Sequence, residues 1–211
     1  DEGINDALGG HHAADLAISS VDFGAIERFI REERWDDAGA FLAAAARDVE
    51  NAGADLVIMA TNTMHRVAPA VEEALSVPFV HIVDATADAI DDAGIDTVGV
   101  LGTAAVMEGE FYAERFADRG IDVMIPGSDD RALVDDVLFD EWTSGVIRDE
   151  SQEACLRVSG DLVDAGAEGV VRGCTEIELL VDQSDRPGVP MFDTTALHVE
   201  RAVENSLGGV R

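Results

Sequence analysis

The sequence predicts an α/β protein made of two pseudo-symmetric parallel-sheet domains, with the active site in the cleft between them. Short apolar runs alternate with longer segments of helical periodicity, which is typical of parallel α/β units. The apolar runs are nearly continuous, as in strands that are buried on both faces. In addition, the segment at 52–61 is repeated at 165–174, which indicates two related halves.

The expected elements follow this alternation along the chain. Strands are expected at 15–21, 55–60, 78–83, 97–102, 122–126, 169–173 and 189–192. Helices are expected at about 36–52, 64–75, 85–93, 109–119, 129–145, 149–165, 176–182 and 194–207. About 100 residues suffice for a small α/β domain. We therefore expect an N-terminal domain of residues 1–84 plus 193–211 and a C-terminal domain of residues 85–192.

The charge of the chain is strongly negative. It has 44 acidic and 14 basic residues, a formal net charge of −30, and every basic residue is arginine. Such a surface disfavours nucleic acid and anionic membranes as partners, because phosphate contacts need a basic face. The acidic residues are spread along the chain, which favours a high-salt cytoplasm, where a Debye length of roughly 3 Å screens self-repulsion.

Several kinds of chemistry are disfavoured by what the sequence lacks. Without lysine, neither a pyridoxal phosphate Schiff base nor a P-loop can form. Neither a CxxC nor an HExxH motif is present, so no metal site is expected. Two cysteines do not make a disulfide framework, and Cys155, inside an expected helix, is interpreted as a buried filler.

Small polar residues follow the two repeated strands. Thr61, Asn62 and Thr63 follow the first, and at the constant offset of the repeat Thr61 corresponds to Cys174, which Thr175 follows. Ligands of parallel sheets bind at the carboxyl ends of strands, where helix N-termini favour anions. The pattern predicts a site for a small carboxylate. Thr61 is equally well a helix cap, whereas for Cys174 a functional role is favoured over that of a buried filler.

Other polar residues leave two interpretations open. Thr103 follows a third strand and is a further candidate donor to the carboxylate. Arg172 either pairs with a carboxylate of the fold, which we favour, or receives a substrate, and Arg148 is equally open. His65 and His198 are either structural or supporting residues of the site. His81 is expected in the core and the adjacent His11 and His12 in a loop.

The residues quoted next carry a resemblance to a known family. "TNTMH" (61–65), "VGVLGTAAVMEGEFYAERF" (98–116), "GVIRDES" (145–151), "GAEGVVRGCTEIELL" (166–180) and "FDTTALH" (192–198) resemble the aspartate/glutamate racemases in order over nearly the whole chain. The resemblance implies two pseudo-symmetric domains, a cofactor-independent active site between them and a homodimer. It also implies an acidic amino acid as substrate, interconverted between its L and D forms.

The resemblance further implies site residues. The two acid/base positions of the family fall on Thr61 and Cys174, and the pair resembles a Thr/Cys subgroup that includes broad-specificity L-aspartate/glutamate racemases. Residues that hold substrate carboxylates would be Asn62, Thr63, Thr103, Thr175 and, where relatives have lysine, Arg148. His65, Glu176 and His198 would be supporting residues.

The sequence departs from the family pattern at its start. The family begins with a strand and a Gly-rich loop, whereas this chain is expected to start inside the following helix. Related functions also remain open on the same architecture, namely maleate isomerase, arylmalonate decarboxylase and hydantoin racemase. A carboxylate-binding protein that has lost one base, with Thr61 in its place, is the alternative from a different class.

Overall fold

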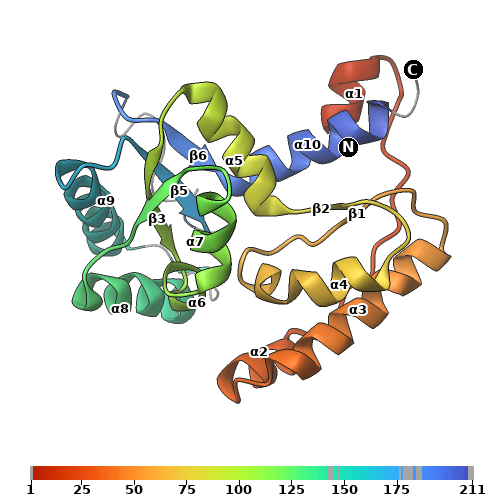
Figure 1. The fold of residues 1–211 in the computed structure, drawn as a ribbon, viewed down its shortest axis with the longest axis horizontal. Coiled ribbons are helices and arrows are strands. Elements are labelled where there is room, and N and C mark those ends of the chain that lie inside the picture. Colours follow the sequence, from red (N-terminus) through yellow and green to blue (C-terminus); the bar gives the residue numbers. More distant parts are fainter. Residues whose placement is uncertain are drawn as a thin grey trace. The chain divides into compact units, whose positions relative to one another are not determined.

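The computed structural model describes residues 2–141, 145–146, 148–175, 177, 183 and 187–208. The chain folds into two compact units (Figure 1). The first unit consists of Asp1–Met59, Met64–His81 and Val199–Arg211, and the second consists of Ala60–Thr63 and Ile82–His198. The domain limits expected from the sequence, 1–84 plus 193–211 and 85–192, stay a prediction.

The first unit is mainly helical and has a small sheet. It contains α1 (Glu2–Leu8), α2 (Phe23–Arg31), α3 (Trp35–Asn51), β1 (Val57–Ile58), α4 (Ala68–Ala74), β2 (Phe79–Val80) and the end of α10 (Thr194–Gly208). A 3-10 helix, η1 (Thr63–Val67), precedes α4. Strands β1 and β2 are parallel, with Val57 opposite Phe79. Both strands are very short, and the buried residues of the two apolar clusters in this unit come from α2, α3, η1, β1 and α4.

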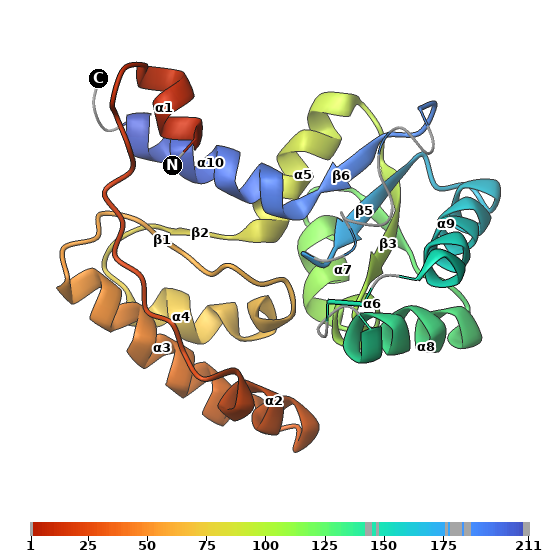
Figure 2. The ribbon, with the colours of Figure 1, turned by 180° about the vertical axis from the view of Figure 1, so that it is seen from behind.

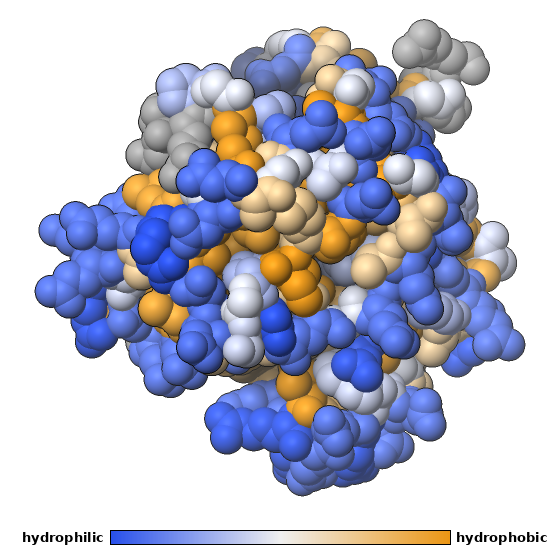
Figure 3. Space-filling view, turned by 60° about the vertical axis from the view of Figure 1, so that its left-hand side comes forward, coloured by the Kyte–Doolittle hydropathy of each residue, from blue (hydrophilic) through white to orange (hydrophobic). Residues whose placement is uncertain are grey.

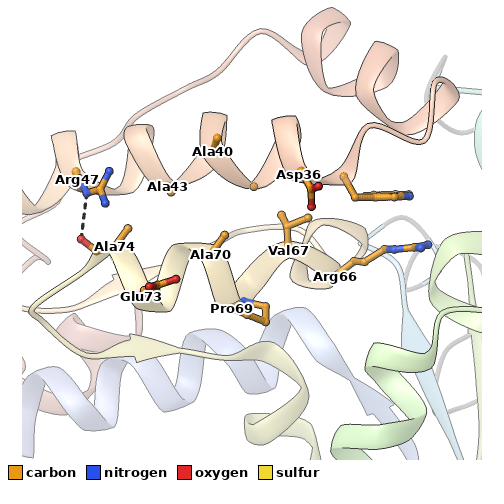
Figure 4. Close-up of a pocket in the computed structure, with 12 residues that line it drawn as sticks. Asp36, Ala40, Ala43, Arg47, Arg66, Val67, Pro69, Ala70, Glu73 and Ala74 are labelled. Carbon is orange, nitrogen blue, oxygen red and sulfur yellow. Dashed lines mark hydrogen bonds between the residues drawn. The ribbon is translucent and has the colours of Figure 1, made fainter.

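Small residues bring α3 and α4 close together. A Cβ added at Gly39 of α3 would lie 3.1 Å from the Cβ of Ala70 in α4. A groove of about 640 Å³ opens beside this contact, and it is lined by Trp35, Asp36, Gly39, Ala40, Ala43, Arg47, Arg66, Val67, Pro69, Ala70, Glu73 and Ala74. In Figure 4 Ala70 and Ala74 of α4 point toward α3, and Arg47 donates to the backbone oxygen of Ala74 at 3.2 Å. The groove contains none of the residues that the sequence predicted for a site.

The second unit is built around a four-stranded parallel sheet of order β4-β3-β5-β6. Its strands are β3 (Thr97–Gly102), β4 (Asp122–Met124), β5 (Gly169–Gly173) and β6 (Met191–Asp193). Its helices are α5 (Ile82–Ala93), α6 (Ala104–Met107), α7 (Glu110–Ala117), α8 (Ser128–Asp136), α9 (Asp149–Asp164) and the start of α10, and a π-helical turn, η2 (Val137–Glu141), follows α8. The parallel α/β fold predicted from the sequence is confirmed.

Helices cover both faces of this sheet (Figures 1 and 2). Leu101 and Val170 pack with α8 and α9 in one core, whereas Val100 and Val171 pack with α5 and α7 in another. Neighbouring residues of β3 and β5 thus point to opposite faces, as the pleat of a strand requires. Since both faces are apolar, the strands appear in the sequence as continuous apolar runs.

The repeated segment has the same backbone form at its two sites. Helix α3 is followed by Ala52 and Gly53, and helix α9 by Ala165 and Gly166, before each strand begins. Gly53 has φ +102° and Gly166 has φ +122°, in a region that residues with a Cβ rarely adopt. The repeat therefore encodes the same helix-to-strand turn in both units.

We expect Gly166→Ala to lower the free energy of unfolding by about 1–3 kcal/mol, because alanine is strained at this φ. Gly53→Ala should cost a similar amount. Gly188→Ala is the matched control, since a Cβ added there would have no atom within 4 Å and its φ is not in this region. Urea titration of the three variants measures the differences. A Gly166→Ala protein as stable as the control would contradict the prediction.

Some elements differ from the expectation. The predicted strand at 15–21 is wrong: this segment has no regular structure, and Leu16 is 62% and Ile18 81% exposed. A strand needs a neighbour for its backbone hydrogen bonds, and none of the described strands pairs with it. The expected helix at 64–75 is divided into η1 and α4, with Pro69 in the first turn of α4, where its missing N–H costs nothing.

Other differences concern the ends of elements. Helices α2 and α6 were not predicted, whereas α1 lies where the chain was expected to start inside a helix. The strand expected at 78–83 ends at Val80 because α5 begins at Ile82. Most of the helix expected at 176–182, and residues 142–144 of the one expected at 129–145, lie outside the described residues.

The surface reflects the composition of the chain. Figure 3 shows a face on which hydrophilic residues predominate, with smaller apolar areas between them. Among the described helices, none combines the length and apolar character needed to cross a membrane.

Candidate active site

The residues that follow β1 are held in the second unit. Thr61 is half-buried, Asn62 is only 4% exposed, and Thr63 begins η1. Thr61 is the third residue after β1 ends, and the chain bends at Asn62 before η1 begins; residues 61–63 are called the Asn62 turn below. A buried amide such as that of Asn62 needs hydrogen-bond partners, and these partners define the site.

A chain of buried hydrogen bonds joins Asn62 to strand β5. Tyr112 Oη lies 2.5 Å from Asn62 Oδ1, Asn62 Nδ2 lies 3.0 Å from Thr194 Oγ1, and Thr194 Oγ1 donates to the backbone oxygen of Arg172 at 2.8 Å. Arg172 is two residues before Cys174. The structure thus ties the turn that follows the first repeated strand to the end of the second.

The predicted structural role of Arg172 is confirmed. Its Nη2 lies 3.2 Å from Asp193 Oδ2, across the β5–β6 pair, and the two side chains are 9% and 21% exposed. Asp193 also accepts from the backbone N–H of Ala196 at 2.9 Å, in the first turn of α10. One carboxylate therefore neutralises a buried charge and caps the helix that carries Thr194.

We expect Asp193→Asn to lower the free energy of unfolding by about 2–4 kcal/mol, because it leaves a largely buried guanidinium without its counter-charge. Asparagine still caps a helix, so the loss reports mainly on the ion pair. Asp161→Asn is the control, since its pair with Arg157 at 2.8 Å is about half exposed and should be worth less than about 0.5 kcal/mol. Chemical denaturation would measure both, and equal losses would contradict the prediction.

A second contact joins the turn to the end of β3. Thr63 Oγ1 and Thr103 Oγ1 lie 3.1 Å apart, and both residues are half-buried. Thr103 also caps α6 by accepting from Val106 N–H. The next backbone N–H, of Ala104, donates to Asp135 Oδ1 at 2.6 Å, and burial raises the pKa of this carboxyl. This helix end therefore already holds a carboxylate of the protein.

Cys174 and Thr175 directly follow β5, and both are half-buried. The Tyr112 hydroxyl is close by: a Cβ added at Gly173 would lie 3.8 Å from Tyr112 Oη. Burial, and after it the charge of Cys174, raise the pKa of Tyr112 above its usual range, so the phenol is neutral. By contrast, Cys155 is 1% exposed, and burial raises the pKa of its thiol to about 11. Its predicted filler role is confirmed.

The other candidate site residues that the structure describes take no part in the hydrogen bonds described above. His65 belongs to the first unit, is 1% exposed, and packs against the ring of His81 with centroids 4.5 Å apart. His198 is buried in α10. Arg148, at the start of α9, binds Glu141 Oε1 at 2.6 Å and is 62% exposed. Glu176 lies outside the described residues.

His81, His11 and His12 have the surroundings that the sequence predicted. His81 is 3% exposed, as predicted for a core residue. His11 and His12 are exposed and lie outside helices and strands, as predicted for a loop. Within the part of the chain that the structure describes, no three His, Cys, Asp or Glu side chains form a group that could hold a metal ion.

Sequence reasoning missed the residues that support the site. Tyr112, Thr194 and Asp193 hold the predicted residues in place, and Asp135 occupies the helix end beside Thr103. One signal was available for Tyr112, because it is the single tyrosine of the chain and falls on the apolar side of an expected helix with Phe116. The others are ordinary polar residues, and only the fold shows their partners.

The fold and site define a parallel α/β protein with a thiol and a hydroxyl at corresponding strand exits. A family model described as Asp/Glu/Hydantoin racemase matches residues 1–202, and the chain belongs to this family. The predicted family resemblance is thereby confirmed.

Similar proteins agree with this assignment. A structure of a candidate Asp/Glu racemase from Yersinia pestis is 40% identical, with a TM-score of 0.92 over 98% of this chain and 90% of that one. A structure of an aspartate racemase homologue from Pyrococcus horikoshii OT3 is 30% identical, with a TM-score of 0.83 over 98% and 89% of the two chains. A glutamate racemase from Herpetosiphon aurantiacus is 30% identical over 68% of this chain and 57% of its own length.

Proposed function

We propose that this protein is a cofactor-independent racemase that interconverts the L and D forms of aspartate or glutamate by two-base proton transfer at Cα. The hydrogen-bonded chain from Asn62 to Arg172 is the observation that carries this proposal. It connects the turn that holds Thr61 to the strand end that presents Cys174, and these are the two equivalent positions of the repeat.

Each base acts on one face of the substrate. The Cys174 thiolate takes the Cα proton and becomes a thiol, while the electron pair left on Cα spreads into the substrate carboxylate. A proton delivered to the opposite face, from the side of Thr61, completes the inversion. In the reverse direction the two groups exchange roles. A thiolate is a competent base once nearby donors lower its pKa from roughly 8.5.

The substrate carboxylate would bind among neutral donors. Thr63, Thr103 and Thr175 have hydroxyl groups at the strand exits, and Asn62 has a second amide hydrogen beyond the one donated to Thr194. Such fixed donors stabilise the charge that develops on the carboxylate as Cα loses its proton. His65, Glu176 and His198 are proposed as supporting residues.

Arg148 is proposed to receive the side-chain carboxylate of the substrate. Its guanidinium carries the required charge and is exposed, but it is paired with Glu141, which also accepts from Ser151 Oγ at 2.8 Å. An incoming carboxylate would either bind Arg148 together with Glu141 or displace Glu141 from it. A homodimer and a high-salt cytoplasm belong to the same proposal and are supported by the family resemblance and by the net charge of −30.

Proton NMR in heavy water tests the proposed function. The Cα proton signals of L- and D-aspartate and of L- and D-glutamate would be followed with the protein at high KCl concentration. Loss of these signals together with formation of the opposite enantiomer is expected. Saturable binding of these amino acids by folded protein, without exchange or inversion, would favour the carboxylate-binding alternative instead.

A further inference from the structure

Tyr112 has a hydroxyl group in an unusual place. It lies in α7, is 1% exposed, and packs against the rings of Phe111 and Phe116 with centroid distances of 5.4 and 5.6 Å. An aromatic ring suffices for such packing, and a buried hydroxyl costs free energy unless it is hydrogen-bonded. The hydroxyl of Tyr112 therefore needs an explanation beyond filling the core.

The direction of each bond in the buried chain follows from donor and acceptor capacity. The backbone oxygen of Arg172 only accepts, so Thr194 donates its single proton to it. Thr194 must then accept from the amide nitrogen of Asn62, which turns the amide oxygen toward Tyr112. This oxygen also only accepts, so the Tyr112 hydroxyl is the donor. Tyr112 and Thr194 together leave one orientation for the Asn62 amide.

The same hydroxyl lies beside the end of β5. The 3.8 Å separation of Tyr112 Oη from a Cβ added at Gly173 places it next to the residue that precedes Cys174. Tyr112 thus contacts Asn62 directly and lies near the end of the strand that presents the thiol. One side chain therefore binds the Asn62 turn and lies close to the end of β5, the two strand exits that the repeat makes equivalent.

We propose that Tyr112 is a positioning residue of the racemase: its hydroxyl orients the Asn62 amide and so holds residues 61–63 in register with the Cys174 strand end. This inference rests on the proposed function, because the register matters only if both strand exits act on one substrate. Tyr112 does not itself exchange a proton with the substrate. Its effect on the reaction passes through Asn62.

The test compares Tyr112→Phe with Thr86→Val, alone and combined with Asn62→Ala. Thr86 is a matched control because its buried hydroxyl donates to the backbone oxygen of Ile82 at 2.8 Å, away from Asn62. We expect Tyr112→Phe to lower kcat/KM about 10-fold and to have no further effect in the Asn62→Ala background. Thr86→Val should have the same small effect in both backgrounds. Additive losses for Tyr112→Phe would overturn the proposal.

A second readout does not depend on activity. The chain has four asparagines and two glutamines, so the side-chain amide signals of Asn62 can be assigned by their loss in Asn62→Ala. Tyr112→Phe should shift these signals and speed their exchange with solvent, and Thr86→Val should leave them unchanged. Unchanged signals in Tyr112→Phe would overturn the proposal. So would full activity of Tyr112→Phe.

The two proposals fail in different ways. A folded wild-type protein that exchanges no Cα proton overturns the proposed function and with it a role of Tyr112 in the reaction. In that case the amide signals still decide whether Tyr112 orients Asn62. An active wild type with additive variants overturns the role of Tyr112 alone.

Discussion

Cys174→Ala is expected to abolish racemisation in both directions, with rates on the order of 10²–10⁴ lower than those of the wild type. Each inversion needs a proton taken from one face and a proton given to the other, so the loss of one group stops both directions. Exchange of the Cα proton should also be lost for the enantiomer whose proton faces the thiol. The NMR assay in heavy water measures exchange, and separation of the enantiomers from the same samples on a chiral column measures inversion.

Cys155→Ala is the control for this experiment. Cys155 is 1% exposed in α9 and burial raises the pKa of its thiol to about 11, so it is a neutral thiol at pH 8. Its replacement should leave the rates unchanged and cost only stability. A thiol reagent at pH 8 should accordingly modify Cys174 first and inactivate the protein. Full activity of Cys174→Ala would refute the assignment of this residue as a base.

The elements of the second unit were largely predictable from the sequence. Strands β3 and β5 and helix α9 lie within one residue of their predicted limits. Residues of these strands pack alternately into two apolar cores, which makes the whole run apolar and easy to recognise. Periodicity is a reliable indicator where burial is symmetric.

The sequence pattern gave a wrong prediction where apolar residues are exposed and not buried. Residues 15–21 have the composition of a strand, but Leu16 and Ile18 are exposed and lack a partner strand among the described residues. Local sequence cannot report whether a neighbouring strand is available. The helix at 64–75 likewise divides at Pro69, and only the resulting backbone shows that η1 and not α4 follows the Asn62 turn.

The candidate site was predicted in its residue types but not in its connections. Thr61, Asn62, Thr63, Thr103 and Cys174 share one feature, a small side chain at the exit of a strand, and this feature can be read locally. The bond between Tyr112 and Asn62 spans 50 residues, and that between Asn62 and Thr194 spans 132. Such pairings depend on the register of a complete sheet, so the repeat indicated the positions while the fold alone supplied their partners.

Thr61 is expected to make Cα exchange strongly unequal for the two enantiomers, by about 10²-fold, because a hydroxyl is a much weaker base than a thiolate. The enantiomers have equal free energies, so kcat/KM for racemisation must be the same in both directions. The rates of Cα exchange need not be equal for the two enantiomers. The Cys174 thiol can return a solvent deuteron to the face from which it took the proton, so that exchange occurs without inversion. The ratio of exchange to inversion therefore reports on the Thr61 side alone.

Thr61→Cys should reduce this difference to less than about 10-fold, because a second thiol makes the two faces chemically alike. Thr61→Ser is the matched control: it keeps the hydroxyl and removes only a methyl group, so the difference should persist. Initial exchange rates of L- and D-aspartate, measured for the three proteins under identical conditions, give the comparison. Equal exchange of both enantiomers by the wild type would mean that a stronger base than the Thr61 hydroxyl serves the second face.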